Sequence, residues 1–248
     1  MTLGGVTGDA PMRVGFPVVD TLTGQTAAFA ILAALFKRER QNVGEFIDVA
    51  MFDASLAFMT SAVVPYLVTG KPPERTGNTG YSGQPTSAVF TAADGRKISL
   101  GVVQQSQFEA LARALSCERW LTDPRFLTPD LRRQHSNAMQ DELQGALQYS
   151  AAEELETRLS AAGVPCGMVR DVAEAISLPR LDERQLTSRL RIDGLPERED
   201  VDIINAGFLF GNDPPGVREP PPRLGQHTEE ILRSLDFSAS EIAALIER

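Results

Sequence analysis

Three groups of residues in this chain of 248 amino acids could carry chemistry: carboxylates at special positions, a glycine-containing loop and two histidines. Asp20 is the most informative of them, because it lies just ahead of a strongly predicted helix. Unpaired N–H groups and the macrodipole at a helix N-terminus favour an ionised carboxylate by about 0.3–2 kcal/mol. Such a carboxylate can act as a nucleophile or a general base. It can also simply cap the helix, and from the local sequence alone the cap is the simpler interpretation.

Two helices are predicted to follow Asp20. Apolar residues in the first recur at the spacing of one buried face, namely Ala28, Ile31, Leu32, Leu35 and Phe36. Residues 46–49 indicate a short strand. A second apolar stripe, from Leu56 to Leu67, predicts a helix that bends or ends near Pro65.

The composition changes after this helical segment. Residues 76–85 are rich in Gly, Asn, Thr and Ser, so they form either a mobile lid or an ordinary linker. Residues 87–91 and 97–103 then flank Asp94-Gly95, a strong signal for a β-hairpin. We expect a small α+β unit to begin here, with helices at residues 107–115 and 130–148 and a strand at residues 164–169.

Capping residues mark several further helix starts. The expected caps are Ser150 with Glu153, Asp171 with Glu174, Thr228, and Ser238 with Glu241.

The overall composition limits the classes of function. With 42% hydrophobic and 23% charged residues, the chain has the composition of a globular protein. Its net charge of -9 repels nucleic acids and anionic bilayers. The longest apolar run has ten residues, about half of what a spanning helix needs. We therefore expect a cytoplasmic protein without nucleic-acid or membrane partners. Its two cysteines are expected to be reduced, and no Cys/His cluster has metal-binding spacing.

Several separated blocks resemble, in order, the class III CoA-transferase family, which includes formyl-CoA and carnitine CoA-transferases and the α-methylacyl-CoA racemases. The blocks are residues 15–24, which contain Asp20, and residues 44–54, 94–95, 123–126, 132–133, 163–167 and 224–228.

The resemblance implies a mixed α/β fold in four parts. Residues 1–70 would be the helical remainder of a Rossmann-like large domain that binds CoA, and residues 71–85 a lid loop and linker. Residues 86–180 would be the small α+β domain with its hairpin. Residues 181–248 would be a return segment whose C-terminal helices pack on the large domain.

The resemblance also implies a reaction. CoA would move from an acyl-CoA to a small free carboxylic acid through acyl-aspartyl anhydride and aspartyl-CoA intermediates, with Asp20 as the nucleophile and no metal or cofactor beyond CoA. In transferases of this family a glycine loop shields the anhydride from water, and its match is residues 80–85. Ser82, Gly83 and Gln84 are therefore expected to bind substrate. Tyr81 and Ser82 replace two of the family's loop glycines, which changes how such a loop would close.

The racemase branch is the first alternative. It needs an acid/base pair, of which one partner matches Asp20 and another is a histidine upstream of residue 1. A nearby glutamate of that branch falls at or beside Gln105, which cannot exchange a proton near neutral pH. Transfer is therefore favoured. We expect His135 to be a solvated surface residue, His227 to orient a helix start, and Arg132 and Arg133 to lie on a solvated helix face rather than to bind a CoA phosphate.

The resemblance begins just before the Asp20 block, so the N-terminal nucleotide-binding half of the family is expected to be absent. Three origins fit: a shortened gene product, a split enzyme, or a chosen boundary. Apolar faces of the first helices and of residues 224–248 would then be exposed unless a partner covers them. That partner would be a second copy, in a homodimer, or a chain carrying the N-terminal half. A last alternative is an inactive fragment that acts as a scaffold or dimer partner.

Overall fold

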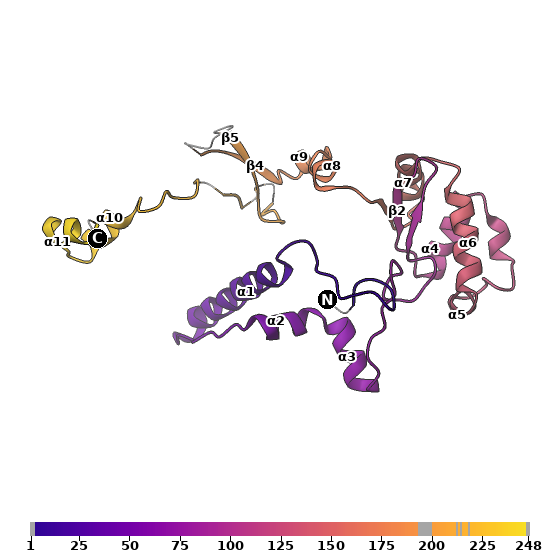
Figure 1. Cartoon of the computed structure of the whole chain (residues 1–248), viewed down its shortest axis with the longest axis horizontal. Coiled ribbons are helices and arrows are strands. Elements are labelled where there is room, and N and C mark those ends of the chain that lie inside the picture. The colour runs from indigo at the N-terminus through magenta and orange to yellow at the C-terminus, as the bar shows by residue number, and fades with distance from the viewer. Residues whose placement is uncertain (1–2, 193–199, 212, 214, 218, 247–248) are drawn as a thin grey trace. The chain divides into compact units, whose positions relative to one another are not determined.

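The computed structural model describes residues 3–192, 200–211, 213, 215–217 and 219–246. It separates into two compact units, Met1–Val169 and Arg170–Arg248. Both units mix helices with a small antiparallel sheet, so the predicted mixed α/β class is confirmed (Figure 1). The four-part division and the return of the C-terminal helices to the large domain stay predictions.

The first unit opens with three helices, α1 (Val18–Gln41), α2 (Met51–Phe58) and α3 (Thr60–Thr69). Helix α1 contacts α2, and α2 contacts α3 (Figure 1). Helices α2 and α3 meet at an angle of 79°, so the bend lies at Met59. The bend or end predicted near Pro65 is wrong, because Pro65 lies inside α3. The strand predicted at residues 46–49 is wrong. No described strand pairs with this segment, and Phe46 is 91% exposed.

The prediction of a buried face on α1 is wrong within this chain. Helix α1 contains no buried residue, and Leu32 and Phe36 are 65% and 60% exposed. Helix α1 is also long and apolar enough to cross a membrane, with a mean hydropathy of 1.5. The ten-residue run underestimates this length, because neutral residues such as Thr26 interrupt the run without adding charge. The core helix of a soluble protein has the same properties, so they do not by themselves place α1 in a membrane.

A three-stranded sheet follows, in the order β1 (Val89–Thr91), β2 (Lys97–Leu100) and β3 (Cys166–Met168), with all pairs antiparallel. The predicted hairpin is confirmed. Its turn is closed by Gly95, whose N–H donates to the Ala92 carbonyl at 3.1 Å and whose φ of +79° suits glycine. The Asp94 carboxylate accepts the Arg96 N–H at 3.1 Å, which fixes the turn.

Helices α4 (Gln105–Ala114), α5 (Pro129–Gln134), α6 (Ser136–Leu147) and α7 (Ala152–Ala161), with the 3₁₀ turn η1 (Glu118–Leu121), complete this part of the chain. The single helix predicted over residues 130–148 is wrong, because the chain breaks at His135 between α5 and α6. Their shared core lies between residues 88 and 164. Its fully enclosed members include Ile98, Phe108, Leu111, Trp120, Phe126, Met139, Leu143, Leu147, Leu155 and Leu159.

Two of the predicted caps lie around α7 and α8 (Val172–Ile176). The capping box of Ser150 with Glu153 is wrong, because no local side chain caps α7. Instead, Asp94 reaches across from the hairpin turn and accepts the Ala152 N–H at 3.2 Å. The box at the start of α8 is confirmed, with the Glu174 N–H donating to Asp171 at 2.8 Å.

The second unit continues with α9 (Arg180–Glu183), the antiparallel pair β4 (Thr187–Arg191) and β5 (Asp200–Ile204), α10 (Thr228–Ser234) and α11 (Ala239–Ile246). Part of the predicted return segment, residues 193–199, lies outside the described residues. The cap predicted at Thr228 is wrong, because α10 begins at that residue and no side chain caps it. The pair of Ser238 with Glu241 is confirmed, since the Ser238 N–H donates to Glu241 Oε2 at 2.8 Å.

Candidate active site

Asp20 lies inside the first turn of α1, as its third residue, and not ahead of the helix as predicted. The helix begins earlier because Pro17 precedes it and its backbone accepts the Thr21 N–H at 3.0 Å. Asp20 is therefore not the helix cap, and the simpler of the two sequence interpretations is wrong. Its side chain is exposed and makes no hydrogen bond or ion pair with any residue that the structure describes.

The backbone around Asp20 offers hydrogen-bond donors. The Val18 N–H donates to Phe16 at 2.8 Å and the Thr21 N–H to Pro17, but the N–H groups of Val19 and Asp20 find no acceptor among the described residues. Free N–H groups in a first helical turn attract negative charge. A carboxylate beside two such donors is suited to attack a carbonyl carbon while a donor stabilises the oxygen that becomes negative.

The predicted glycine loop forms a tight turn. The Gly83 N–H donates to the Gly80 carbonyl at 3.0 Å, and Gly83 has a φ of +65°. Gly80 lies so close to Ser87 that an added Cβ would meet the serine Oγ at 2.4 Å. Tyr81, at the tip, is 94% exposed. The backbone conformation therefore favours glycine at position 83, and the Ser87 side chain leaves little room for a Cβ at position 80, whereas the position of Tyr81 is open to solvent.

Gln84 anchors the end of this loop. Its side chain is 3% exposed, and Nε2 donates to the Pro129 carbonyl at the start of α5 over 3.3 Å. The other amide atom, Oε1, is buried without a hydrogen-bond partner in the described residues. No hydrogen bond or ion pair joins Asp20 to Ser82, Gly83 or Gln84 in the part of the chain that the structure describes. Substrate binding by these three loop residues stays a prediction.

The prediction that Arg132 lies on a solvated helix face is wrong. Arg132 is 1% exposed, and it donates from Nη1 to the Phe126 carbonyl at 2.7 Å and from Nη2 to Gln105 Oε1 at 3.0 Å. Its guanidinium carbon lies 4.0 Å from the centre of the Phe108 ring. Burial lowers the pKa of this guanidinium below its usual range. Its Nε has no partner among the described residues.

A sequence signal for this burial existed. The buried stripe of Met139, Leu143 and Leu147 on α6 extends back by seven residues to Arg132, at the spacing of one helix face. Arg133, in contrast, is exposed and pairs with Asp130 on the same turn, as expected for a solvated face.

The two histidines lie at helix starts. His135 is exposed between α5 and α6, in agreement with a surface role. His227 precedes α10, and its carbonyl accepts the Ile231 N–H at 2.9 Å. Among the described residues, no group of three or more His, Cys, Asp or Glu side chains could hold a metal ion.

Comparison with known sequences decides the family. The sequence model of CoA-transferase family III matches residues 1–228. The chain belongs to the class III CoA-transferases. The order of blocks around Asp20, the hairpin and residues 224–228 therefore reflects common ancestry.

The relatives of this chain that carry names are transferases of acyl-CoA substrates. An acyl-CoA transferase of Fusarium pseudograminearum is 32% identical over 233 residues, which cover 94% of this chain and 50% of the relative. Succinyl-CoA–D-citramalate CoA-transferase of Chloroflexus aurantiacus is 31% identical over 91% of this chain and 55% of the relative. Acetyl-CoA:oxalate CoA-transferase of Acetobacter aceti is 32% identical over 93% of this chain and 57% of the relative. The chain thus spans about half the length of the curated relatives that it matches.

Solved structures agree with the fold. A CaiB/BaiF family protein from Brucella suis has a TM-score of 0.73 and 25% identity, covering 95% of this chain and 60% of that protein. Rv3272 from Mycobacterium tuberculosis has a TM-score of 0.74 over 90% of this chain and 59% of that protein, at 24% identity.

Proposed function

We propose that this chain is the nucleophile-bearing part of a class III CoA-transferase that moves CoA from an acyl-CoA to a small carboxylic acid. The observation that carries the proposal is the placement of Asp20 in the first turn of α1, where its carboxylate is exposed beside the free N–H groups of Val19 and Asp20. The family match and the names of the relatives support the same reaction.

The proposed reaction has four acyl transfers in which every step exchanges one activated bond for another. The Asp20 carboxylate attacks the thioester carbonyl, the C–S bond breaks, and CoA thiolate leaves an acyl-aspartyl anhydride. The thiolate then attacks the aspartyl carbonyl and releases the donor acid, giving aspartyl-CoA. The acceptor carboxylate displaces the thiolate to form a second anhydride, and the thiolate attacks the acceptor carbonyl, which restores Asp20. No net oxidation and no hydrolysis occurs.

Water must be excluded while an anhydride is present. We propose that the loop of residues 80–85 does this, with its base fixed by Gln84 and its tip, Tyr81, facing solvent in the free chain. Ser82, Gly83 and Gln84 are the proposed substrate-binding residues of that loop. Because Gln84 is buried, we expect it to act by holding the turn that presents Ser82 and Gly83.

The racemase alternative is disfavoured by Gln105. A racemase needs a group that gains and loses a proton at this position, whereas the amide of Gln105 accepts a hydrogen bond from Arg132 at 3.0 Å and carries no exchangeable acid proton near neutral pH. Acyl transfer needs no such group.

For substrates, we propose small dicarboxylic acids and their CoA thioesters, since the named relatives act on succinate, glutarate, oxalate and D-citramalate. For partners, we propose either a homodimer or association with a chain that carries the part of the family not matched here. The exposed apolar residues of α1, among them Leu32 and Phe36, support a covering chain. A cytoplasmic location without nucleic-acid or membrane partners belongs to the same proposal.

Isotope transfer tests the proposed function. The chain, alone and together with the unmatched half of a relative, is incubated with CoA-labelled succinyl-CoA and a free acid such as glutarate, and the label in glutaryl-CoA is measured. We expect transfer, abolished by Asp20→Asn. Retention of full transfer in that variant would show that Asp20 is not the nucleophile.

Two further measurements separate the alternatives. A racemase would incorporate deuterium from solvent at the α-carbon of a branched acyl-CoA without an acceptor acid, and we expect none. An inactive scaffold would bind the unmatched half of a relative stably without any turnover, whereas the proposed enzyme turns over in that complex.

A further inference from the structure

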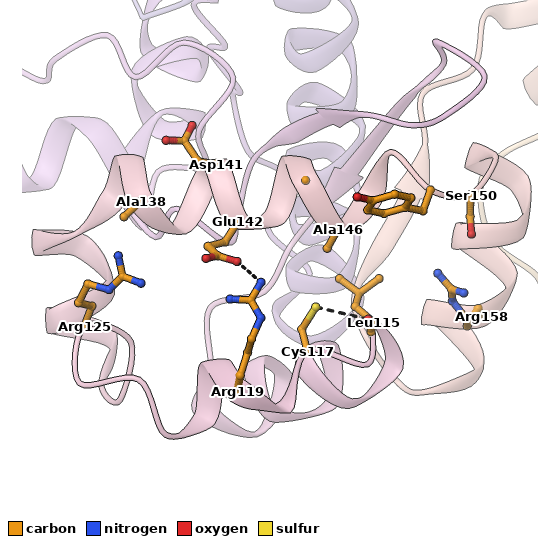
Figure 2. Close-up of a pocket in the computed structure, with 12 residues that line it drawn as sticks. Leu115, Cys117, Arg119, Arg125, Ala138, Asp141, Glu142, Ala146, Ser150 and Arg158 are labelled. Carbon is orange, nitrogen blue, oxygen red and sulfur yellow. Dashed lines mark hydrogen bonds and ion pairs between the residues drawn. The ribbon is translucent and has the colours of Figure 1, made fainter.

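A cavity of ≈ 680 Å³ lies outside the region of Asp20 and the glycine loop, on the helical part that contains α6 (Figure 2). It is bounded by the end of α4, by η1, by the middle of α6, by the segment between α6 and α7, and by the last turn of α7. Its volume falls within the usual range for sites that bind small organic molecules. The side chains that matter most for its chemistry are Arg119, Arg125, Glu142, Ser150 and Arg158.

The cavity gathers three guanidinium groups on a chain whose net charge is -9. Figure 2 shows Arg125 at one end and Arg158 at the other, with Arg119 between them. Ser150 lies at the same end as Arg158. The three arginines come from separate elements, so their spacing along the sequence gives no motif.

The arginines differ in how much of their hydrogen-bonding capacity is used. Arg119 pairs with Glu142 through Nη2. Arg125 uses Nε and Nη2 for the Asp123 carboxylate, at 3.1 Å and 2.7 Å, and keeps Nη1 for another acceptor. The Arg158 guanidinium has no hydrogen bond or ion pair to any described residue. Since each guanidinium has five N–H donors, the three together leave many donors for a ligand.

The acidic residues of the wall do not oppose an anion equally. Glu142 is already neutralised by Arg119 and also accepts Trp120 Nε1 at 3.1 Å. Asp141 lines the cavity, but in Figure 2 its carboxylate points away from Arg119. The unpaired cation of Arg158 therefore sets the charge of its end of the cavity.

We propose that this cavity binds a small organic anion with at least two acidic groups, carboxylate or phosphate, one held by Arg158 with Ser150 and another by Arg119 and Arg125. Guanidinium groups bind both kinds of acid through paired hydrogen bonds. Apolar wall residues, Leu115, Ala138 and Ala146, would contact the carbon skeleton between the acidic groups. This site is separate from the proposed acyl-transfer site and does not depend on it.

The single tryptophan of the chain provides the readout. Trp120 is fully buried, and its indole N–H is bonded to Glu142 of the cavity wall. A ligand acid that draws Arg119 away from Glu142 changes this bond and hence the fluorescence of Trp120. Citrate and fructose 1,6-bisphosphate are the probes, at constant ionic strength, and trimethyl citrate is the uncharged control for the carboxylate probe.

We expect a saturable change in Trp120 fluorescence with at least one charged probe and none with the ester. The tighter of the two probes identifies the acid as carboxylate or phosphate. Arg158→Gln should weaken binding by about tenfold or more, since it removes the charge-assisted hydrogen bonds to one acidic group of the ligand. Arg113→Gln, which changes an exposed arginine of α4 outside the cavity, should leave the affinity unchanged.

Asp20→Asn should also bind the probe normally, which separates this site from the proposed active site. The thermal midpoint of each variant shows that it is folded, and alkylation of Cys117, another wall residue, should slow in the presence of the bound probe. No saturable response to either charged probe, or an equal affinity in folded Arg158→Gln, would overturn the proposal.

Discussion

Arg132 donates from Nη2 to Oε1 of Gln105 across 3.0 Å, so a buried cation is bound by a neutral amide. Its second partner is the Phe126 carbonyl, and the face of its guanidinium lies over Phe108. No carboxylate forms an ion pair with it among the described residues. The arrangement ties the start of α4, the segment before α5 and α5 itself to one side chain, which is why the charge is retained inside the core.

Two substitutions of Arg132 distinguish the contribution of its volume to stability from that of its charge. Arg132→Ala leaves a cavity and an unpaired Phe126 carbonyl, so we expect the free energy of unfolding to fall by about 2–5 kcal/mol. Arg132→Met keeps most of the volume and removes the buried charge, so it should cost less. Urea denaturation of both variants measures the difference. Equal and negligible losses would show that the side chain does not support the core.

The ion pair of Glu142 with Arg119 predicts a dependence of stability on pH. The hydrogen bond from Arg119, and secondarily that from Trp120, lowers the pKa of Glu142 below its usual 4.5. A carboxylate whose pKa is lower in the folded state stabilises the fold above the unfolded pKa, and this stability is lost as the pH falls through the folded pKa.

Glu142→Gln should therefore lower the urea midpoint at neutral pH, and the difference from wild type should shrink as the pH falls from about 4.5 towards the folded pKa. Denaturation curves of the two proteins at several pH values give this difference. A gap that stays constant down to the acid limit would contradict the assignment.

Asp94, which is distant in the sequence, caps α7 in place of a neighbouring residue. Asp94→Ala removes the acceptor for the Ala152 N–H and for the Arg96 N–H, so we expect a loss of about 1 kcal/mol in the free energy of unfolding. Ser150→Ala is the matched control, because only its backbone is bonded, through its carbonyl to the Ala93 N–H. If Ser150→Ala lowered the free energy of unfolding more than Asp94→Ala, the result would support the local capping box of Ser150 with Glu153 instead.

Because the apolar face of α1 is exposed, a substitution on it should affect association with a partner chain more than the stability of this chain. Leu32 is 65% exposed, so Leu32→Ser should change the free energy of unfolding of this chain by less than about 0.5 kcal/mol. In the proposed complex with the unmatched half of a relative, the same change should weaken association by about tenfold, since burial of a leucine contributes about 1.5–3 kcal/mol.

Sedimentation of the mixed chains measures this association, and Glu39→Ser on the same helix is the polar control. If Leu32→Ser and Glu39→Ser associate equally well, the apolar face of α1 is not the covered surface.

Local patterns predicted those features whose causes are local. The Asp94-Gly95 turn and the cap of Asp171 with Glu174 follow from a few neighbouring residues, and both are confirmed. The burial of Arg132 and the reach of Asp94 to α7 depend on contacts between segments that are distant in the sequence. The prediction of a buried face on α1 was wrong for another reason. Apolar periodicity shows that a face is made to be covered, but it does not show whether the covering layer is part of the same chain.

The position of Asp20 shows the same limit at the candidate site. Sequence placed a carboxylate at the start of a helix, but only the backbone geometry shows that Val19 and Asp20 have free N–H groups. The resemblance to the family supplied the role of nucleophile, which neither residue type nor spacing could supply.

The transfer of oxygen from the acceptor acid to Asp20 tests the central claim most directly. When an acceptor labelled with ¹⁸O in its carboxylate attacks aspartyl-CoA, the bridging oxygen of the new anhydride is ¹⁸O, and it stays on Asp20 after the thiolate removes the acyl group. Trypsin releases residues 14–37, in which Asp20 is the sole acidic side chain, so mass spectrometry locates the label without ambiguity. We predict ¹⁸O in this peptide after turnover in the presence of the unmatched half of a relative. Turnover that leaves the peptide unlabelled would contradict a covalent role for Asp20.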